Sequence, residues 1–430
     1  MRLFPAELEI EDNEGFSEEK DIFQREKIGN GLTNILTSVS DPCVVAVDGS
    51  WGSGKSVFLK MWAGELRNDG IPVIYFDAFK NDYFDDAFIA IVGEIINLAI
   101  KQSGEKSSAD EFKSKALAVF KIFALAGSKK LIEHATFGVI GDEEVKDITD
   151  AITETKGLEK QFDEILKSYG NSHDVLEAFK KTLSDLPEVL GEGEEGEEAS
   201  DKNKKPLIII IDELDRCRPD FALQILERIK HLFSVPNVHF VLGVHLEQLE
   251  NSVKYAYGGG IDAHTYLQKF IHFTVALTTN NFRYREMEYA TYMEHIIGQF
   301  DFNTADKEFI NIAKEMILKA SERESLSFRT IERLLTKICI LTRYSRVRNH
   351  QNHLVSGLCI LNVTNPGLFK KAKAGGLQFS EVEKALGLSL IEDSQWGEIT
   401  ELWRYYTDYS FSQEDAEKII SFQLPPMEQR

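Results

Sequence analysis

Gly49-Ser50-Trp51-Gly52-Ser53-Gly54-Lys55-Ser56 is the stretch that decides the fold of this chain. It matches G-x-x-x-x-G-K-[ST], the pattern of a phosphate-binding loop. Its surroundings fit, because Cys43–Val47 is a short apolar run typical of a buried strand and Val57–Trp62 reads as the start of a helix. A strand, a glycine-rich turn and a helix in this order predict a P-loop, also called a Walker A motif.

The loop residues have predicted physical roles. Gly52 and Gly54 let the backbone curl so that successive N–H groups face phosphate oxygens, and the start of the helix adds its positive end. We expect Lys55 to reach the β- and γ-phosphates and the Ser56 hydroxyl to bind Mg²⁺. The predicted nucleotide-binding residues are Gly49, Ser50, Trp51, Gly52, Ser53, Gly54, Lys55, Ser56 and Val57.

A second signal is Leu207–Ile211, an unbroken apolar run typical of a strand buried on both faces of a parallel sheet. The run ends in Asp212-Glu213, as a Walker B strand does. Because ligands bind outside the carboxyl ends of parallel strands, we expect both acids to lie beside the P-loop. Asp212 is predicted to bind Mg²⁺, directly or through a water, and Glu213 to act as general base on the attacking water. Together the motifs predict a nucleoside triphosphatase.

The composition narrows the class of protein. A chain of 430 residues with 43% hydrophobic content is long enough for two or three domains with real cores. A net charge of −21 argues against nucleic-acid binding, which depends on Lys and Arg neutralising phosphates. The four dispersed cysteines argue against a disulfide framework and fit a reducing cytosol. We expect no signal peptide, since the chain turns acidic directly after Met1–Pro5. No run of about eighteen apolar residues is present, so we expect a cytoplasmic protein with peripheral membrane contact at most.

The order of the predicted elements suggests a domain organisation. Residues 1–40 form a lead-in segment, helical from about Asp21, which either packs near the nucleotide base or is a plain helix on the core. Residues 41–100 and 206–281 form the two parts of the P-loop core, and residues 282–430 form a C-terminal helical domain. Strands are expected at 43–47, 73–76, 207–211, 238–244 and 271–277, and core helices at 87–100 and 221–233.

Residues 101–205 are predicted to be an insert. Lys55 and Asp212 lie much further apart than the roughly 30 residues of one βαβ unit. Apolar residues at helical spacing predict helices at 112–126, 129–137 and 165–183, and the Gly- and Glu-rich run at 191–200 is typical of a solvated loop. We therefore expect an α/β P-loop NTPase core with a parallel sheet, a helical insert between the second strand and the Walker B strand, and a C-terminal helical domain.

Several of these pieces together resemble the KAP family of P-loop NTPases. The most specific parts are Trp51 inside the P-loop and the string Asp212-Glu213-Leu214-Asp215-Arg216-Cys217. The weaker parts are Phe76–Phe79, Phe240–Val244, Tyr266–Ile271 and Ser327–Arg333. The resemblance covers about residues 18–340.

The resemblance implies a parallel sheet, a catalytic glutamate directly after the metal-binding aspartate, and an insert that carries transmembrane helices in many members. Here the insert is too charged to span a membrane, so the chain resembles a soluble, bacterial-type member.

The resemblance also bears on three further site residues. The usual form of the family has an aspartate where His245 stands in this chain. His245 is therefore either a sensor of the γ-phosphate or a solvated residue that closes a strand. Arg329 and Arg333 share a face of a predicted helix. The resemblance implies that one of them contacts nucleotide, and a surface salt-bridge face is the alternative.

Arg216 has two interpretations. In the first, it acts as an arginine finger, which compensates charge on the γ-phosphoryl group. It would then lie at the entrance of its own catalytic site or reach the site of a neighbouring subunit. Alternatively, it pairs with Asp215 or Glu213 and holds the loop. The catalytic candidates are Lys55, Glu213 and Arg216; the metal candidates are Ser56 and Asp212; and Arg329 joins the nucleotide-binding residues.

Three functions compete. The first is a Mg²⁺-dependent ATPase acting as a conformational switch between core and helical domain. Bacterial members of the family occur among phage-exclusion genes, so the resemblance suggests a role in phage defence or inter-element conflict.

The alternative is a membrane-proximal scaffold in which the bound nucleotide has a structural role. It is suggested by amphipathic segments at 116–126 and 131–140. A nucleic-acid motor or GTPase is third, since the overall charge is acidic, Arg343–His350 is the nearest candidate for a basic nucleic-acid contact, and no Asn-Lys-x-Asp motif is present. We expect ATP and Mg²⁺ as ligands, and a protein partner or a second copy of the chain.

Overall fold

The structure is a computed structural model of the chain. It describes residues 8–83, 87–103, 176–187, 205–277, 282–300, 306–344, 352–388 and 394–407. The chain divides into two units. The sheet unit holds residues 9–49 and 55–277, and the helical unit holds Leu8, residues 50–54 and the chain from residue 278 onward, in each case as far as the structure describes them.

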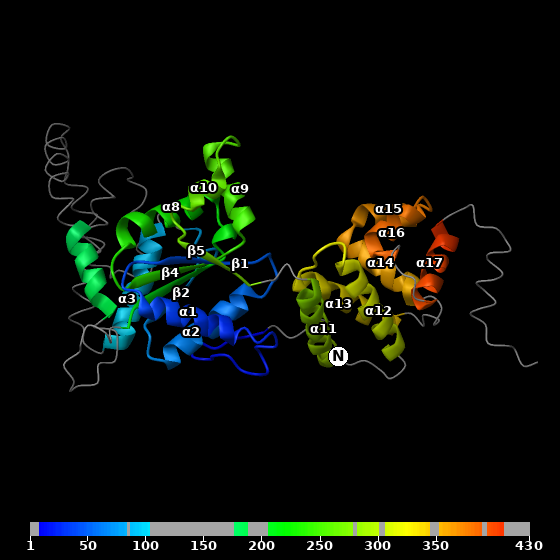
Figure 1. Cartoon of the computed structure of the whole chain (residues 1–430), viewed down its shortest axis with the longest axis horizontal. Helices are drawn as coiled ribbons and strands as arrows, with labels where there is room; N and C mark the ends of the chain where they lie inside the picture. The colour runs from blue at the N-terminus through cyan, green and yellow to red at the C-terminus, as the bar shows by residue number, and fades with distance from the viewer. Residues whose placement is uncertain are drawn as a thin grey trace, which may run out of the picture. The chain divides into compact units, whose positions relative to one another are not determined.

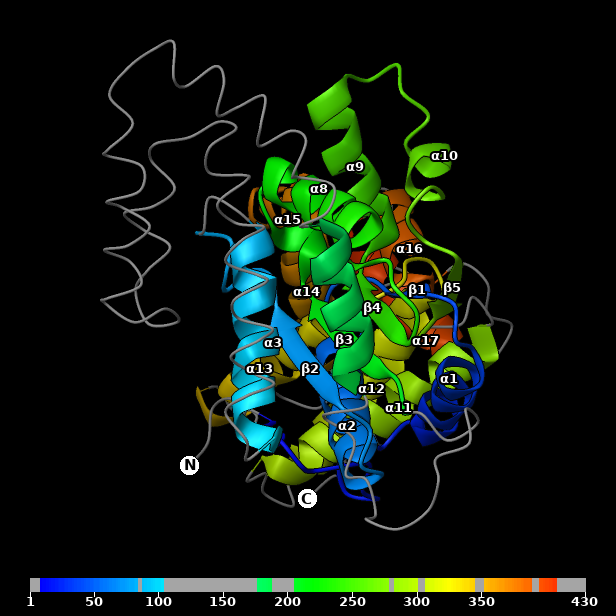
Figure 2. The same cartoon turned by 90° about the vertical axis from the view of Figure 1, so that its left-hand side faces the viewer.

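The sheet unit is built on five parallel strands in the order β2-β3-β4-β1-β5 (Figures 1 and 2). Their bounds are β1 Val44–Asp48, β2 Val73–Asp77, β3 Leu207–Asp212, β4 Val238–Val244 and β5 Phe273–Ala276. Every residue of β3 and β4 is buried, whereas the edge strand β5 alternates between half-buried and exposed. The parallel α/β core predicted from the sequence is confirmed, and so is the burial of the 207–211 run on both faces.

Helices cover both faces of this sheet (Figures 1 and 2). On one face α1 (Glu26–Ser38) and α2 (Lys55–Asn68) bury apolar side chains against alternate residues of the strands. On the other face lie α3 (Ala87–Ser103), the helical residues 176–187, α8 (Pro219–Arg228) and α9 (Leu246–Tyr257). A short helix, α10 (Ala263–Leu267), leads toward β5. Each fully buried Leu, Ile or Phe of these layers stabilises the fold by about 1.5–3 kcal/mol.

The first helix begins later than the sequence suggested. Helix α1 starts at Glu26 rather than near Asp21. Gln24 has a left-handed φ of 54°, which interrupts a helix at that point. The Asp21 carboxylate accepts hydrogen bonds from the backbone N–H groups of Arg25 and Glu26, both at 2.9 Å, so Asp21 satisfies the first free donors of the helix instead of joining it.

The lead-in segment packs on α2. A Cβ on Gly64 would overlap the backbone oxygen of Glu14, so the close approach of the two chains requires glycine there. Arg67 donates to the carbonyl oxygen of Asp12, and the Trp62 indole donates to the Thr33 hydroxyl at 2.9 Å. Residues 12–15 therefore contact the carboxyl-terminal half of α2, the half away from Lys55.

Two predictions about helices differ in detail from the structure or fall outside it. The helix predicted at 221–233 is α8 followed by a π-helical turn, Ile229–Phe233. Of the predicted insert, residues 176–187 are helical, while residues 104–175 and 188–204 lie outside the described residues. The domain boundaries within 101–205 therefore stay predictions.

The described residues from 282 onward are helical, as predicted. The helices are α11 Phe282–Gln299, α12 Lys307–Ser321, α13 Phe328–Tyr344, α14 Asn352–Thr364, α15 Pro366–Lys373, α16 Phe379–Leu386 and α17 Ser394–Thr407 (Figure 1). Helix α14 packs against α12, α13, α15 and α16. Gly357 of α14 makes room for its neighbours, because a Cβ there would overlap Trp403 of α17 and Leu386 of α16.

Candidate functional site

The predicted P-loop connects β1 to α2. Gly52 and Gly54 have φ angles of 76° and 83°, a backbone region open to glycine and strained for other residues. Lys55 is the first residue of α2 and is buried, with 8% of its surface exposed. Its ammonium group donates a hydrogen bond to the carbonyl oxygen of Gly49. The sequence Gly-x-Gly-Lys thus forms a tight turn that leads into a helix N-terminus, which is the geometry that binds phosphate.

The register of the sheet sets one row of residues at its carboxyl edge. Asp77 of β2 pairs with Asp212 of β3, Asp212 pairs with Gly243 of β4, and Gly243 pairs with Val47 of β1. Strand β4 therefore lies between the strand that leads to the P-loop and the strand that ends in Asp212.

Asp212 is held by three donors at this edge. It is 1% exposed. The Tyr75 hydroxyl donates to its Oδ2 at 2.6 Å, the Glu213 N–H donates to its Oδ1 at 2.8 Å, and the Ser56 side chain also hydrogen-bonds to it. Burial raises the pKa of Asp212, and these hydrogen bonds oppose the rise. The predicted metal residues Ser56 and Asp212 are therefore in direct contact.

Gly243 makes this contact possible. A Cβ at Gly243 would lie 2.5 Å from the Leu59 Cδ1 and closer still to the Asp212 Oδ1. The missing side chain in the intervening strand leaves the space that the Asp212 carboxylate uses to reach across toward α2. The need for a glycine at this position could not be predicted from the sequence, because it arises only when β4 lies between β3 and β1.

Glu213 adopts an uncommon backbone conformation and carries an ion pair. Its φ of 60° and ψ of 24° are left-handed, a conformation in which strain concentrates at functional sites. Its Oε1 lies 2.8 Å from the Nη1 of Arg216, three residues on in the 3-10 turn Leu214–Arg216. Burial raises the pKa of Glu213, and Arg216 opposes the rise. Of the two interpretations of Arg216, the structure contains the ion pair with Glu213.

Lys55 lies among carboxylates. Burial lowers the pKa of its ammonium group, and Asp215, Asp212 and Asp48 oppose that effect. Asp48 closes β1 and accepts a hydrogen bond from the Leu246 N–H at 2.9 Å. The site therefore combines one buried lysine with three acids. The phosphates of a bound nucleotide would add negative charge to the site, which the lysine and the N–H groups of the loop can offset.

The donor set fits a magnesium ion. Ser56 and Asp212 offer hard oxygen atoms, the ligands that Mg²⁺ prefers alongside phosphate oxygens and water. The buried charge of Asp212 also favours a cation nearby. In the part of the chain that the structure describes, no group of three or more His, Cys, Asp and Glu side chains is arranged to bind a metal, so the candidate ligands are Ser56 and Asp212.

The other predicted residues lie in different surroundings. His245 follows β4 and precedes α9, with 22% of its side chain exposed and its Nε2 3.9 Å from the Glu247 carboxylate. Arg329 and Arg333 are exposed on α13. Within the helical unit, which includes Ser50–Gly54, the Phe328 N–H donates to the Gly52 carbonyl oxygen at 3.1 Å. The nucleotide contacts expected of His245 and Arg329 stay predictions.

Tyr75 contacts the site but was not predicted from the sequence. The residue lies on β2, two positions before Asp77, and it appeared only as part of an apolar strand. A tyrosine in a buried strand needs a partner for its hydroxyl, and that requirement was the available signal. The partner is Asp212, far away in the sequence and brought close by the pairing of β2 with β3.

Comparison with protein families decides the class of this chain. The model of the KAP family P-loop domain matches residues 25–345, which is well over half of the sequence. The chain belongs to the KAP family. The matched region includes all of the cluster around Lys55, Asp212 and Glu213, so these residues belong to a KAP-type P-loop domain, a nucleotide-binding class of fold.

Other comparisons add little to the KAP assignment. No curated protein matches this sequence. One similar solved structure is the Aeropyrum pernix ORC2 protein, solved as ADPNP–ADP complexes. It is 12% identical, and the similarity covers 97% of this chain and 86% of that chain with a TM-score of 0.35. A similarity of this size carries no argument about fold or function.

No helix among the described residues has both the length and the apolar character needed to cross a bilayer. The amphipathic pieces predicted at 116–126 and 131–140 lie outside the described residues, as do residues 345–350 of the basic cluster.

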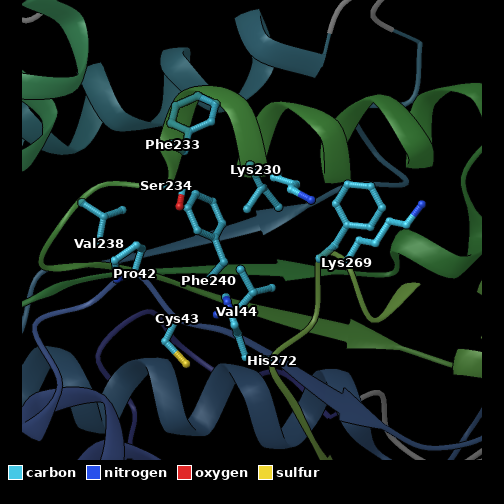
Figure 3. A pocket seen from close by; sticks show the side chains of 12 residues that line it. Pro42, Cys43, Val44, Lys230, Phe233, Ser234, Val238, Phe240, Lys269 and His272 are labelled. Carbon is cyan, nitrogen blue, oxygen red and sulfur yellow. Dashed lines mark hydrogen bonds between the residues drawn. The ribbon is translucent and has the colours of Figure 1, made fainter. Parts of the chain in front are cut away.

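A pocket lies at the amino ends of the strands of the KAP-type sheet. It has a volume of about 130 Å³, and Figure 3 shows Val44, Val238 and Phe240 from the amino ends of β1 and β4 lining it. Lys230 and His272 also line it, and the imidazole of His272 accepts a hydrogen bond from the Val44 N–H at 2.9 Å. Because the P-loop and Asp212 follow the carboxyl ends of the strands, this pocket is not part of the phosphate site.

Proposed function

We propose that this chain is a Mg²⁺-dependent ATPase of the KAP type that works as a nucleotide-driven conformational switch. The observation that carries the proposal is the cluster at the carboxyl edge of the sheet. The Ser56 side chain hydrogen-bonds to Asp212, Lys55 is buried beside Asp212, and Glu213 follows directly. Phosphate-binding, metal-binding and base functions therefore have candidates within one small region.

Binding of the triphosphate uses the loop backbone and Lys55. The N–H groups of residues 49–57 and the α2 N-terminus would surround the phosphate oxygens. Lys55 would exchange its hydrogen bond to the Gly49 carbonyl for oxygens of the β- and γ-phosphates. The glycines at 52 and 54 support this role because their left-handed backbone turns the amides toward one centre.

Hydrolysis uses Glu213. The proposed general base takes a proton from the attacking water, and burial raises its pKa toward the range where a base is effective near neutral pH. The structure pairs this carboxylate with Arg216. Arg216 would have to release or share the carboxylate during the reaction, and it could then face the γ-phosphoryl group. Mg²⁺, when bound to Ser56 and Asp212, supplies charge neutralisation of the β- and γ-phosphate oxygens.

The assay that tests this activity compares wild type with Lys55→Ala. We expect wild type to hydrolyse ATP in the presence of Mg²⁺ and Lys55→Ala to lose at least about a hundredfold, since the loss of one phosphate-clamping charge costs several kcal/mol. Lys27→Ala is the matched control, because Lys27 lies on α1 of the same unit with an exposed side chain. Full hydrolysis by Lys55→Ala would contradict the proposal.

The biological setting is proposed from the family alone. Bacterial KAP proteins occur among phage-exclusion genes, so we extend a role in phage defence or inter-element conflict to this chain, acting in the cytoplasm. Four free cysteines support a reducing compartment. Expression in a phage-sensitive host should lower plaque counts for wild type but not for Lys55→Ala; equal counts would contradict the role.

A partner protein or a second copy of the chain completes the proposal. Arginine fingers in P-loop enzymes are supplied either in the same chain or by a neighbour. Arg216 is half-buried at the site and is the first candidate. Turnover per molecule that rises with protein concentration supports a shared site, and turnover that stays constant from nanomolar to micromolar protein argues against one.

A further inference from the structure

Tyr75 connects strand β2 to the candidate metal residue. Its hydroxyl donates to the Asp212 Oδ2 at 2.6 Å, which is short for a hydrogen bond to a carboxylate and typical of a strong one. Burial is the main cause that raises the pKa of this hydroxyl, and Asp212 adds to it, so Tyr75 is a neutral donor in the physiological range. A neutral donor holds the carboxylate without removing its charge.

The same strand also holds the backbone around Asp212. The Ala78 N–H, directly after β2, donates to the Asp212 carbonyl oxygen at 2.9 Å. Further along, Asp82 accepts from both the backbone N–H and the guanidinium of Arg218, at 2.8 and 2.9 Å. Strand β2 and its exit thus fix the segment from Asp212 to Arg218 at three points, and Tyr75 is the point that acts on the carboxylate itself.

We infer that Tyr75 is a positioning residue that orients Asp212 for its role toward Mg²⁺. The inference rests on the proposed function. The terminal torsion of an aspartate is broad, so a carboxylate with one fixed oxygen can still turn. The Glu213 N–H fixes Oδ1 and the Tyr75 hydroxyl fixes Oδ2 of the carboxylate that also hydrogen-bonds to the Ser56 side chain. Groups that orient a metal ligand from behind change metal affinity by about 10- to 100-fold when removed.

The test is the effect of Mg²⁺ on the equilibrium affinity for ATP, measured by titration at 4 °C with and without the metal. For Tyr75→Phe we expect ATP affinity without Mg²⁺ within about twofold of wild type, because phosphate contacts come from the P-loop. The Mg²⁺-dependent gain in affinity should shrink about tenfold, and the Mg²⁺ concentration for half-maximal hydrolysis should rise about tenfold. A merely structural role would change both affinities together.

Two comparisons make the result specific. Tyr266→Phe is the matched control, since Tyr266 also lies in the sheet unit and its hydroxyl pairs with Tyr257 at 3.0 Å, with no part in the site. It should leave the Mg²⁺ effect unchanged. In the Asp212→Asn background, Tyr75→Phe should cause no further loss, because the charged group that it orients is already gone.

The outcomes separate the inference from the proposed function. Wild type whose ATP affinity responds to Mg²⁺, with Tyr75→Phe responding equally, overturns the inference alone. Wild type that does not bind ATP, or binds it equally with and without Mg²⁺, overturns the proposed function and the inference with it. Because the substitution removes one oxygen and keeps the ring, the strand packing is retained, and a melting curve of each variant verifies this.

Discussion

At the scale of single residues, Gly243 shows how a missing side chain can create a site. It lies in β4 between the strand that leads to the P-loop and the strand that ends in Asp212. Its neighbours would be displaced by any Cβ, because Leu59 belongs to the core and the Asp212 oxygen is already hydrogen-bonded. The glycine is required for space rather than for backbone freedom.

Gly243→Ala should therefore damage both stability and the site. Overpacking in a buried strand costs about 1–3 kcal/mol of unfolding free energy, which urea denaturation can measure. Because the clash falls on the Asp212 carboxylate, the Mg²⁺-dependent gain in ATP affinity should fall as well. Gly259→Ala is the control, since a Cβ there meets no atom within 4 Å. A Gly243→Ala protein as stable and as Mg²⁺-responsive as wild type would contradict this account of β4.

Some residues of the candidate site can be predicted from the sequence, and others cannot. Lys55, Ser56, Asp212 and Glu213 were predicted because each lies in a local motif whose neighbours reveal it. Tyr75 was not, because its contact with Asp212 arises only when β2 pairs with β3.

At the scale of elements, the start of β1 depends on two histidines. The Cys43 N–H donates to the Nδ1 of His239 in β4 at 3.3 Å, and the Val44 N–H donates to the Nδ1 of His272, just before β5. His239 is fully buried. An imidazole can accept at Nδ1 only when that nitrogen carries no proton, so the hydrogen bond from Cys43 favours the neutral form of His239.

Stability should therefore fall as the pH drops below about 6.5, the ordinary value for histidine. Burial lowers the pKa of His239, and the Val39 and Leu36 carbonyl groups only partly oppose that effect. With a folded-state pKa below the unfolded one, the unfolded chain takes up the proton first. The contribution of neutral His239 to the free energy of unfolding is fully present above about pH 6.5. It is lost as the pH falls from there to the folded-state pKa of His239, with a slope of up to about 1.4 kcal/mol per pH unit.

The variant that checks this is His239→Asn, whose side-chain oxygen can accept from Cys43 in place of Nδ1. Denaturation midpoints from pH 7.5 to 5 should decline less steeply for His239→Asn than for wild type. His231→Asn, an exposed histidine of the π-helical turn, should keep the wild-type slope. Identical slopes for His239→Asn and wild type would show that His239 does not control this end of the sheet.

Elements were predicted well where the pattern was local. All five strands lie where apolar runs indicated. For β3 and β4 the reason is that strands buried on both faces need such runs. The start of α1 was predicted too early, because the Asp21 cap and the left-handed Gln24 are a matter of backbone geometry that apolar spacing does not encode. The strand order was not predictable, since it depends on contacts between distant segments.

At the scale of the whole molecule, the side chains of the proposed chemistry belong to one of the two units. Lys55, Ser56, Asp212 and Glu213 all lie in the sheet unit, and the helical unit has its own buried residues around α14. A net charge of −21 fits a protein whose charged ligand binds through backbone amides and one buried lysine rather than through a basic surface.

Glu213 offers the most direct test of the central claim, because removal of its negative charge should separate binding from hydrolysis. ATP binding and ATP turnover would be measured for wild type and Glu213→Gln with Mg²⁺, each from nanomolar to micromolar protein. We expect Glu213→Gln to bind ATP within a few-fold of wild type and to hydrolyse it at least about a hundredfold more slowly. Turnover by Glu213→Gln equal to that of wild type would contradict the assignment of the base. Binding of ATP by both proteins without hydrolysis by either would contradict the ATPase itself and favour a nucleotide-binding scaffold.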